Sequence, residues 1–464
     1  MTIPVAAARG SISAWKRWST ALLCGVFVAA GGCNGGSGGI ASGTNGGGAT
    51  GGDVTGGTGG GAGPITPGAG GGGGGTGSPT GGSDTPGGDT PSTPPGSGGG
   101  GGTVTATLDP GSTSDTTVRT SANISNVTAS DGIGGVPVAL KNVNAVQFVT
   151  QATNFDIAAQ LTDPANRAVV AYRPPATAPQ QTTGVFLNTH VNTLPYPTSN
   201  QDTPITNGIY TEGLIVDPAT STGYTTTVTV KNDPNLSQGL LRVNLFLVGT
   251  EAQKSENRDA LDKAVTVWRA IYGQAGIVLD VQTADVASGT GVLPNPVAGS
   301  DFYKSQAQAS RSNAVNIYLG QAISNTGGTN PGNDTGALLG VASAVPGPNI
   351  PTVTSAVAID LVQHAGTDGV FSDAEVEVLG ETLAHEAGHY LGLSHPVEFA
   401  DMSHATFVEG DLLPDTATCT SEAQCLANGI VKNVMFPSPV AGIPQQRDVT
   451  GQQGATLNLQ VMVD

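Results

Sequence analysis

The stretch that decides how this chain folds covers residues 385–395, which read HEAGHYLGLSH. It ends a longer run in which apolar residues recur at helical spacing, so the run predicts a helix with one buried face. Ser372 and Glu375 precede this run three residues apart, as in a capping box at a helix start. Gly392 can stop the helix near Leu391, because glycine adopts a positive φ at little steric cost.

The histidines of this stretch have the spacing of metal ligands. On a helix, His385 and His389 lie one turn apart on the same face, so both imidazoles can reach a single ion. Glu386 projects about 100° around the helix axis from His385 and can flank that ion without binding it. A turn at Gly392 would bring back His395 as a third nitrogen ligand. Three protein ligands leave one position open, which is typical of a catalytic rather than a structural zinc site.

This arrangement predicts hydrolysis. A zinc ion lowers the pKa of a bound water to about 7 and polarises a carbonyl group. Glu386 is then the expected general base, which takes the proton of the water and passes it to the leaving amine. Three of the six histidines of the chain fall within these eleven residues, so coincidence is a weak explanation. The alternatives are solvated or capping histidines, and a metal site that has lost catalysis.

The HExxHxxGxxH pattern of residues 385–395 resembles the extended zinc signature of the metzincin clan of metallopeptidases. Residues 433–437, which read NVMFP, are similar to the Met-turn of that clan. The resemblance implies that Met435 lies beneath the metal as a hydrophobic floor, with an ordinary core methionine as the alternative. It also implies an α+β catalytic domain in which a mixed, twisted sheet carries the active-site helix.

Within the clan, residues 411–419 (DLLPDTATC), then Cys425 and the Met-turn, look most like the pappalysin-type enzymes. Matrixin-like enzymes are the alternative, and the resemblance covers about residues 238–464. No tyrosine stands two residues after Met435, so the extra tyrosine ligand of astacin- and serralysin-type relatives is not expected. By the same resemblance, a strand over residues 338–345 borders the cleft and would pair with extended substrate.

The first 33 residues are typical of an export signal. Basic residues precede an apolar run over 21–30, which is too short to span a bilayer. Residues 30–33 (AGGC) resemble the lipobox of bacterial lipoproteins, which implies lipidation of Cys33 and a lipid anchor. Asn34 follows, so we expect the outer membrane or the cell surface rather than inner-membrane retention. An ordinary signal peptide and secretion are the alternative.

The remaining cysteines fit an exported protein. Cys24 lies within the signal, and Cys419 and Cys425 are six residues apart in a segment rich in Thr, Ser and Ala. An even pair in an exported domain predicts a disulfide in this loop, with two free thiols as the alternative. If Cys33 is lipidated, no free cysteine remains upstream of the catalytic domain, so latency through a cysteine bound to zinc is not expected.

Composition divides the remaining chain. Residues 31–102 contain 36 of the 70 glycines, and such a segment cannot bury enough apolar surface to fold. We therefore expect a disordered Gly/Ser/Thr/Pro linker over residues 34–103. Residues 104–237 contain short apolar runs separated by turn residues, which predict a β-sandwich. The clearest runs are 104–108, 136–140, 168–172 and 224–230. Pro137 would confine the second run to a sheet edge or a strand start.

From residue 238 the pattern changes. An apolar strand is followed by a helix over 255–273, in which Leu261, Ala264, Val265, Trp268 and Ile271 share a face. Further strands follow, and this order predicts a mixed sheet with a helix packed on it. The predicted strands cover residues 241–248, 277–281, 314–319, 338–345 and 355–361. The sequence assigns no function to the β-rich domain before them, for which a pro-domain, an adhesion module and a spacer stay open as alternatives.

The remaining polar residues suggest weaker sites. Asp401, Asp411 and Asp415 follow the third histidine and can bind a structural calcium ion, with a solvated loop as the alternative. His190 is interpreted as a surface or structural residue. His364 and His404 are interpreted as loop or surface residues, with contact to substrate or stabilisation of an oxyanion as the alternative. The net charge of −18, with 17 Lys and Arg, leaves no basic patch, so no nucleic-acid partner is expected.

The sequence therefore predicts a zinc endopeptidase that acts on extracellular or envelope proteins, with a protein or peptide as substrate. One alternative is a surface-binding lipoprotein that uses zinc for stability without catalysis. Another is a zinc hydrolase of a non-peptide substrate. Cleavage of a general protein substrate, tested with and without a chelator, separates the first hypothesis from the second.

Overall fold

The computed structural model describes residues 104–111, 117–127, 133–151, 157–170, 191–216, 224–287, 291–294, 307, 310–324, 339–366, 368–400, 406–411, 413–437 and 445–464. Within these residues, no helix is long and apolar enough to cross a membrane. The predictions made for the export signal, the linker, Cys33, His190, Asp401 and His404 lie outside them. The described parts of residues 104–237 (the β region) and 238–464 (the C-terminal region) belong to one compact unit.

The β region is built from two sheets. In spatial order, the first sheet contains β1 (Ala106–Leu108), β3 (Ile133–Leu140), β8 (Gly208–Val216), β5 (Ile157–Thr162) and β6 (Ala168–Val170). The second contains β2 (Val118–Val127), β9 (Tyr224–Asn232), β4 (Ala145–Gln151) and β7 (Val191–Tyr196).

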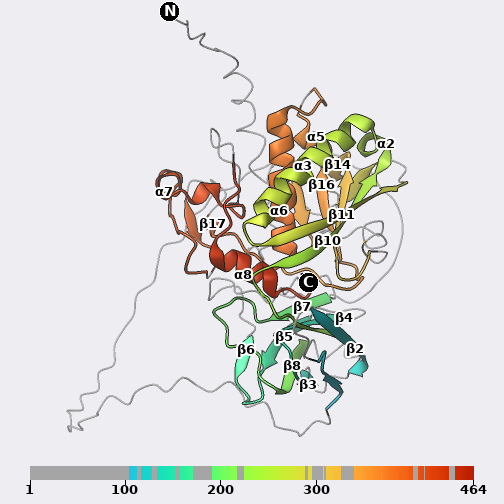
Figure 1. The fold of residues 1–464 in the computed structure, drawn as a ribbon, viewed down its shortest axis with the longest axis vertical. Helices are drawn as coiled ribbons and strands as arrows, with labels where there is room; N and C mark the ends of the chain where they lie inside the picture. The colour runs from blue at the N-terminus through green and yellow to red at the C-terminus, as the bar shows by residue number, and fades with distance from the viewer. Residues whose placement is uncertain are drawn as a thin grey trace, which may run out of the picture. The chain divides into compact units, whose positions relative to one another are not determined.

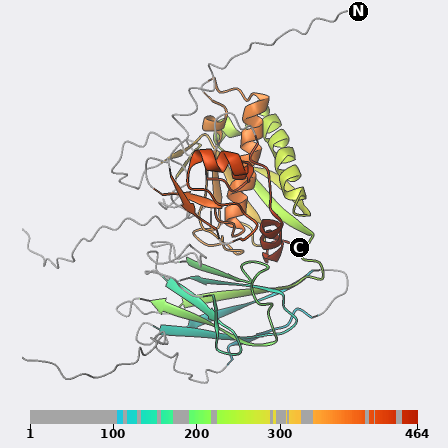
Figure 2. The same cartoon turned by 90° about the vertical axis from the view of Figure 1, so that its left-hand side faces the viewer.

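The two sheets share one hydrophobic core, to which Val138 and Leu214 contribute from the first sheet and Phe148 and Val228 from the second. They face each other as the layers of a sandwich (Figure 2). Strands β3 and β9 contain the whole of the runs 136–140 and 224–230. Strand β1 begins two residues into the run 104–108, and β6 covers residues 168–170, with the last two residues of the fourth run outside the described residues.

Pro137 corrects one expectation. It lies in the middle of β3, which has β1 on one side and β8 on the other, rather than on an edge strand or at a strand start. The register explains how a residue without an N–H is tolerated there. The pairing of β1 with β3 begins only at Val138, and Thr105 donates to the carbonyl of Pro137 from its backbone N (3.0 Å) and its Oγ1 (2.6 Å). The missing donor therefore faces the end of β1 rather than an interrupted ladder.

The C-terminal region is organised around a five-stranded mixed sheet. Four of its strands run parallel to one another, and the fifth, at one edge, pairs antiparallel with its neighbour. In spatial order the strands are β11 (Ile277–Val286), β10 (Gly239–Val248), β13 (Val315–Gly320), β16 (Val357–Asp360) and β15 (Gly340–Ala342). The mixed sheet expected from the sequence is thus present, although β15 is shorter than the predicted run over 338–345.

Two long helices, α3 (Ser255–Gly273) and α6 (Asp373–Tyr390), cover the same face of this sheet (Figure 1). The face of α3 that its periodicity predicts is buried, with Trp268 fully enclosed. The helices cross closely at Gly380, where a Cβ would lie 2.6 Å from the carbonyl oxygen of Ala264. Helix α6 is therefore fixed against both the sheet and α3.

Shorter elements complete the region. They are α2 (Gly249–Ala252), β12 (Val292–Pro294), β14 (Ala322–Ser324), α5 (Leu361–His364), β17 (Val397–Phe399), β18 (Phe407–Glu409), α7 (Glu422–Asn428), η2 (Ile430–Lys432) and α8 (Gly451–Leu459).

The β region contacts the C-terminal region through buried polar groups. Lys231 on β9 is fully buried, and its Nζ donates to the carbonyl oxygens of Asn458 and Val463, each at 2.7 Å. The same Nζ pairs with Asp233 at 3.0 Å. From β4, Gln147 donates to the carbonyl of Gly347 at 3.1 Å. These contacts join the sandwich to the end of α8 and to the loop after β15.

Replacing Lys231 with Met tests this interface. The substitution leaves buried Asp233 and two carbonyl oxygens without their cationic partner, and breaking a buried pair in this way costs about 3–5 kcal/mol. We expect denaturant unfolding to show a free energy of unfolding lower by that amount. Lys141→Met, at an exposed position of the same region, is the control and should change little. Equal losses in the two variants would contradict the importance of the contact.

Glu212 generates a second prediction, on pH. Its buried carboxylate joins the two sheets by accepting from Thr150 Oγ1 at 2.8 Å, and burial raises its pKa from 4.5 to about 7. Between these pH values the folded state keeps a proton that the unfolded state releases, so stability falls as pH rises from 4.5 to 7.

Glu212→Gln should remove that dependence, which is on the order of 3 kcal/mol for a shift of this size. Urea unfolding at several pH values measures it, with exposed Glu409→Gln as the control. Parallel pH profiles for wild type and Glu212→Gln would refute the assignment.

Candidate metal centre

Helix α6 begins and ends where the sequence predicts. The backbone N–H of Ser372 donates to Glu375 Oε2 at 2.7 Å, and the N–H of Glu375 donates back to Ser372 Oγ at 3.3 Å. This reciprocal pair satisfies donors that a helix start leaves free. At the other end Gly392 has φ +92°, and its N–H donates to the carbonyl of His389 at 2.8 Å. The glycine therefore reverses the chain directly after the helix.

This reversal brings the three predicted histidines together. His385 and His389 project from one face of α6, and His395 returns to them from the loop. The Nε2 atom of His395 lies 3.0 Å from that of His389 and 3.3 Å from that of His385. All three side chains are buried, at 9%, 3% and 1% exposure for His385, His389 and His395.

The opposite nitrogen of each ring faces a hydrogen-bond acceptor. Nδ1 of His385 lies 2.7 Å from the carbonyl oxygen of Val434, and Nδ1 of His389 lies 2.7 Å from that of Leu393. Nδ1 of His395 lies 2.9 Å from Glu398 Oε1. Because each Nδ1 must carry the proton to make these bonds, each neutral ring presents an unprotonated Nε2 to the other two.

The donor set fits a zinc ion. Tetrahedral ligands at about 2.0–2.1 Å from zinc stand roughly 3.3 Å apart, close to the Nε2 separations given above. Three lone pairs that face one another repel unless a cation lies between them. Burial also favours the neutral ligand form, since it lowers the pKa of His385 to about 3 and that of His389 well below its usual range. Among the described residues, these histidines are the group with metal-ligand geometry.

Glu386 lies beside the histidines at 4% exposure. Burial raises the pKa of its carboxyl to about 8, although the backbone N–H of Ala342 on β15 donates to it and opposes the rise. A cation held by the neighbouring histidines would lower this pKa again. Strand β15 approaches α6 so closely that a Cβ on Gly340 would lie 2.7 Å from Glu386 Cγ. The carboxyl group is thus held between α6 and the edge of the sheet.

Met435 packs against α6 at Gly388, the residue before His389, and its role as the floor of the site stays a prediction. Its side chain is fully buried, and a Cβ on Gly388 would lie 2.6 Å from its sulfur. The loop is held by Asn433, whose Oδ1 accepts from the N–H of Met435 at 2.9 Å. The Asn433 amide also pairs reciprocally with Gln453 at 2.9 and 3.0 Å. Helix α8, which the sequence does not predict, therefore supports this turn.

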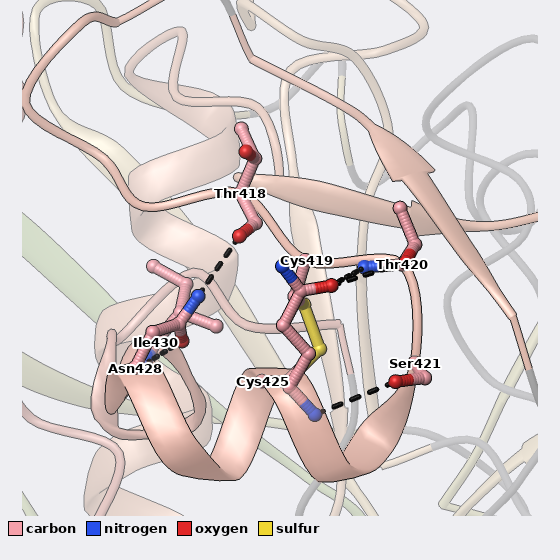
Figure 3. Close-up of a disulfide and its surroundings, with 8 residues drawn as sticks. Thr418, Cys419, Thr420, Ser421, Cys425, Asn428 and Ile430 are labelled. Atoms are coloured by element: carbon pink, nitrogen blue, oxygen red, sulfur yellow. Dashed lines mark hydrogen bonds between the residues drawn. A yellow bond between two sulfur atoms is a disulfide. The ribbon is translucent and has the colours of Figure 1, made fainter.

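Cys419 and Cys425 form the disulfide that the sequence predicts (Figure 3). The expected loop is only part of the structure, because Cys425 lies within α7 and its N–H donates to the carbonyl of Ser421. Both cysteines are buried in a small apolar cluster that also contains Phe407 and Phe436. The disulfide thus anchors the segment between the third histidine and the Met-turn.

The other candidate residues have local roles. Asp411 accepts from Thr416 Oγ1 at 2.6 Å, and Asp415 accepts from Thr450 Oγ1 at 2.9 Å, so calcium binding at these residues stays a prediction. The interpretation of His364 as a loop or surface residue is wrong. It is fully buried in α5, with its two nitrogens 2.6 Å from the carbonyl of Asp360 and 3.0 Å from Thr382 Oγ1. It is the last residue of α5, and its ring lies against α6.

Comparison with known proteins yields a slight likeness. No protein-family model and no curated protein matches the chain. Among solved structures, metalloproteinase-II from Bacteroides fragilis aligns at 16% identity and a TM-score of 0.24, over 38% of this chain and 54% of that chain. Mature mirolysin of Tannerella forsythia, in complex with a cleaved peptide, aligns at 17% identity and a TM-score of 0.30, over 48% of this chain and 90% of that chain. Likeness at this level establishes neither fold nor activity.

Gly388→Ala tests the packing of Met435 beneath the helix. The added methyl group would overlap the sulfur, and overpacking of this kind costs about 1–3 kcal/mol. We expect a lower free energy of unfolding and weaker zinc binding, measured by chelator competition. Shortening the opposing side chain in Gly388→Ala/Met435→Val should recover part of both.

The matched control is Gly273→Ala at the exposed end of α3, where a Cβ meets no atom within 4 Å. It should be neutral or slightly stabilising. If Gly388→Ala behaves like this control, Met435 does not pack against the helix as described.

Proposed function

We propose that the chain is a zinc-dependent endopeptidase of the metzincin type, most similar to the pappalysin-type enzymes. The observation that carries the proposal is the convergence of three buried, unprotonated Nε2 atoms, with that of His395 3.0 Å and 3.3 Å from the other two, beside a buried carboxylate. A structural site would use four protein ligands, whereas three leave a position for water or substrate. Met435 beneath the helix and the mixed sheet support the clan assignment.

When bound, zinc would activate a water molecule and polarise the carbonyl of the scissile peptide. His385, His389 and His395 would hold the ion, and their Nδ1–H bonds keep the rings in the orientation required. Glu386 would accept the proton of the attacking water and donate it to the leaving nitrogen. Its side chain is buried beside the histidines, so it lies within the site where this proton transfer would take place.

Strand β15 is the part of the sheet that an extended peptide would reach. It pairs with β16 on one side, and α6 packs close to it at Gly340. Its residues are buried, but it is the last strand of the sheet, and a strand at a sheet edge can bind a peptide by adding a strand. Backbone hydrogen bonds then supply affinity and side-chain pockets supply specificity. We propose that substrate lies along this edge, with its scissile bond near Glu386.

We also propose that the protein is exported and attached by lipid at Cys33, so that its substrates are extracellular or envelope proteins. The AGGC sequence at residues 30–33 supports this proposal. Metabolic labelling with a fatty-acid analogue tests it: wild type should be labelled and Cys33→Ser should not. Secretion without labelling of the wild type would favour an ordinary signal peptide.

Cleavage of casein by the full chain tests the activity. We expect cleavage that a chelator abolishes and added zinc restores. Glu386→Gln should lower the rate by about 10²–10⁴-fold, because it keeps the shape of the side chain but cannot take up a proton. The control measurements are bound zinc per chain and thermal unfolding, both of which should resemble wild type.

Two results would overturn parts of this scheme. A folded wild type that holds zinc but cleaves no protein or peptide would reject the endopeptidase and favour a zinc-stabilised binding protein. Undiminished cleavage by Glu386→Gln would reject Glu386 as the base while leaving the peptidase in place.

A further inference from the structure

The three histidines of the metal centre differ in the groups that hold them. His385 and His389 donate from Nδ1 to backbone carbonyl oxygens, which are neutral acceptors. His395 alone among them donates to a side chain, the carboxylate of Glu398, at 2.9 Å. A carboxylate makes the stronger, charge-assisted hydrogen bond. The ligand contributed by the loop thus has a partner of a different kind from the two contributed by the helix.

His395 is also the ligand that needs external support. His385 and His389 are fixed by the hydrogen bonds and packing of α6, whereas His395 lies between the Gly392 turn and β17. Its position therefore depends on the hairpin that β17 forms with β18. Glu398 is the central residue of β17 and pairs with Val408 of β18, so its backbone is held in this two-stranded hairpin.

The hairpin is fixed against the histidine loop on one side. The N–H of Gly410, just after β18, donates to the carbonyl of Pro396 at 3.2 Å. A Cβ at Gly410 would overlap the carbonyl oxygen of His395 and would lie 3.2 Å from Glu398 Cγ. The absence of a side chain at this position lets the two strands close around His395 and Glu398 together.

On the other side the hairpin is anchored to the Met-turn. The ring of Phe399 lies 5.1 Å from that of Phe407, which in turn lies 5.8 Å from that of Phe436, the residue after Met435. Phe407 and Phe436 pack with the buried disulfide. The side chain of Glu398 is 27% exposed, yet its backbone belongs to a framework that continues into the floor of the metal centre.

We propose that Glu398 is a positioning residue of the metal centre, which fixes the tautomer and orientation of His395 and strengthens it as a zinc ligand. A carboxylate behind a metal-binding histidine keeps the proton on Nδ1, makes Nε2 more basic and offsets part of the charge of the ion. This inference rests on the proposed zinc site. Loss of such a partner typically weakens metal binding or activity by about 10–100-fold.

Two substitutions separate charge from hydrogen bonding. Glu398→Gln keeps an oxygen that can accept from Nδ1 but removes the charge, whereas Glu398→Ala removes both. The control is Glu409→Gln, which removes the same charge from an exposed position on the paired strand. The full chain is stripped of metal, and zinc dissociation constants are measured by competition with a chromophoric chelator. The visible spectrum of the cobalt-substituted protein reports the ligand geometry.

We expect zinc affinity to fall by about 10–100-fold in Glu398→Ala and by less in Glu398→Gln, with Glu409→Gln unchanged. The cobalt spectrum should change in Glu398→Ala only, and the melting temperature of the metal-free protein should stay near that of wild type. A purely structural role predicts the opposite, namely a lower metal-free melting temperature with unchanged affinity in the fraction that remains folded.

Wild-type zinc affinity and an unchanged cobalt spectrum in Glu398→Ala would overturn the inference. So would equal losses in Glu398→Ala and Glu409→Gln, which would assign the effect to general charge. These outcomes are distinct from failure of the proposed function. A wild type that binds zinc without cleaving peptides still tests Glu398, whereas a wild type that binds no zinc rejects both proposals.

Discussion

The Nε2 atom of His395 lies 3.0 Å from that of His389 and 3.3 Å from that of His385, and imidazole lone pairs this close repel one another unless a cation lies between them. The arrangement persists because the proton of each ring is bound on the far side, by Val434, Leu393 and Glu398. Burial also lowers the pKa of His385 and His389, so protonation of these two rings does not easily relieve the repulsion. The surrounding structure is the framework that keeps the Nδ1–H groups of the three rings pointed away from the centre.

That framework consists of close backbone contacts as much as of hydrogen bonds. Glycines stand where α6 meets α3, where the edge strand meets Glu386, and where α6 meets Met435. The positions are Gly380, Gly340 and Gly388. The β region reaches the same helix indirectly, because Gln147 binds the carbonyl of Gly347 and the N–H of Gly347 donates to the carbonyl of Tyr390 at 2.8 Å. The sandwich is therefore packed against the elements that support the three histidines.

Features encoded by local pattern could be predicted from the sequence, and features created by distant contacts could not. Helix α6 could be predicted because its cap, its apolar spacing and its terminal glycine all lie within about twenty residues. The same holds for α3. Helix α8 could not, because its sequence, GQQGATLNL, has little amphipathic contrast, and its role depends on a Gln453–Asn433 pair that forms only in the fold. Nothing near His364 or Lys231 in sequence signals that these polar side chains are buried.

The hydrogen bonds of the three histidines differ in how far they reach along the chain. The partner of His389 is four residues away and that of His395 is three, whereas His385 depends on Val434, forty-nine residues downstream. Residues 389–398 therefore form a nearly self-contained module that could be transplanted onto another helix with two of its three ligands already oriented. The first ligand is the one that such a graft would leave free to rotate. In protein engineering terms, the Met-turn is then the second component that any transplant of this site has to bring with it.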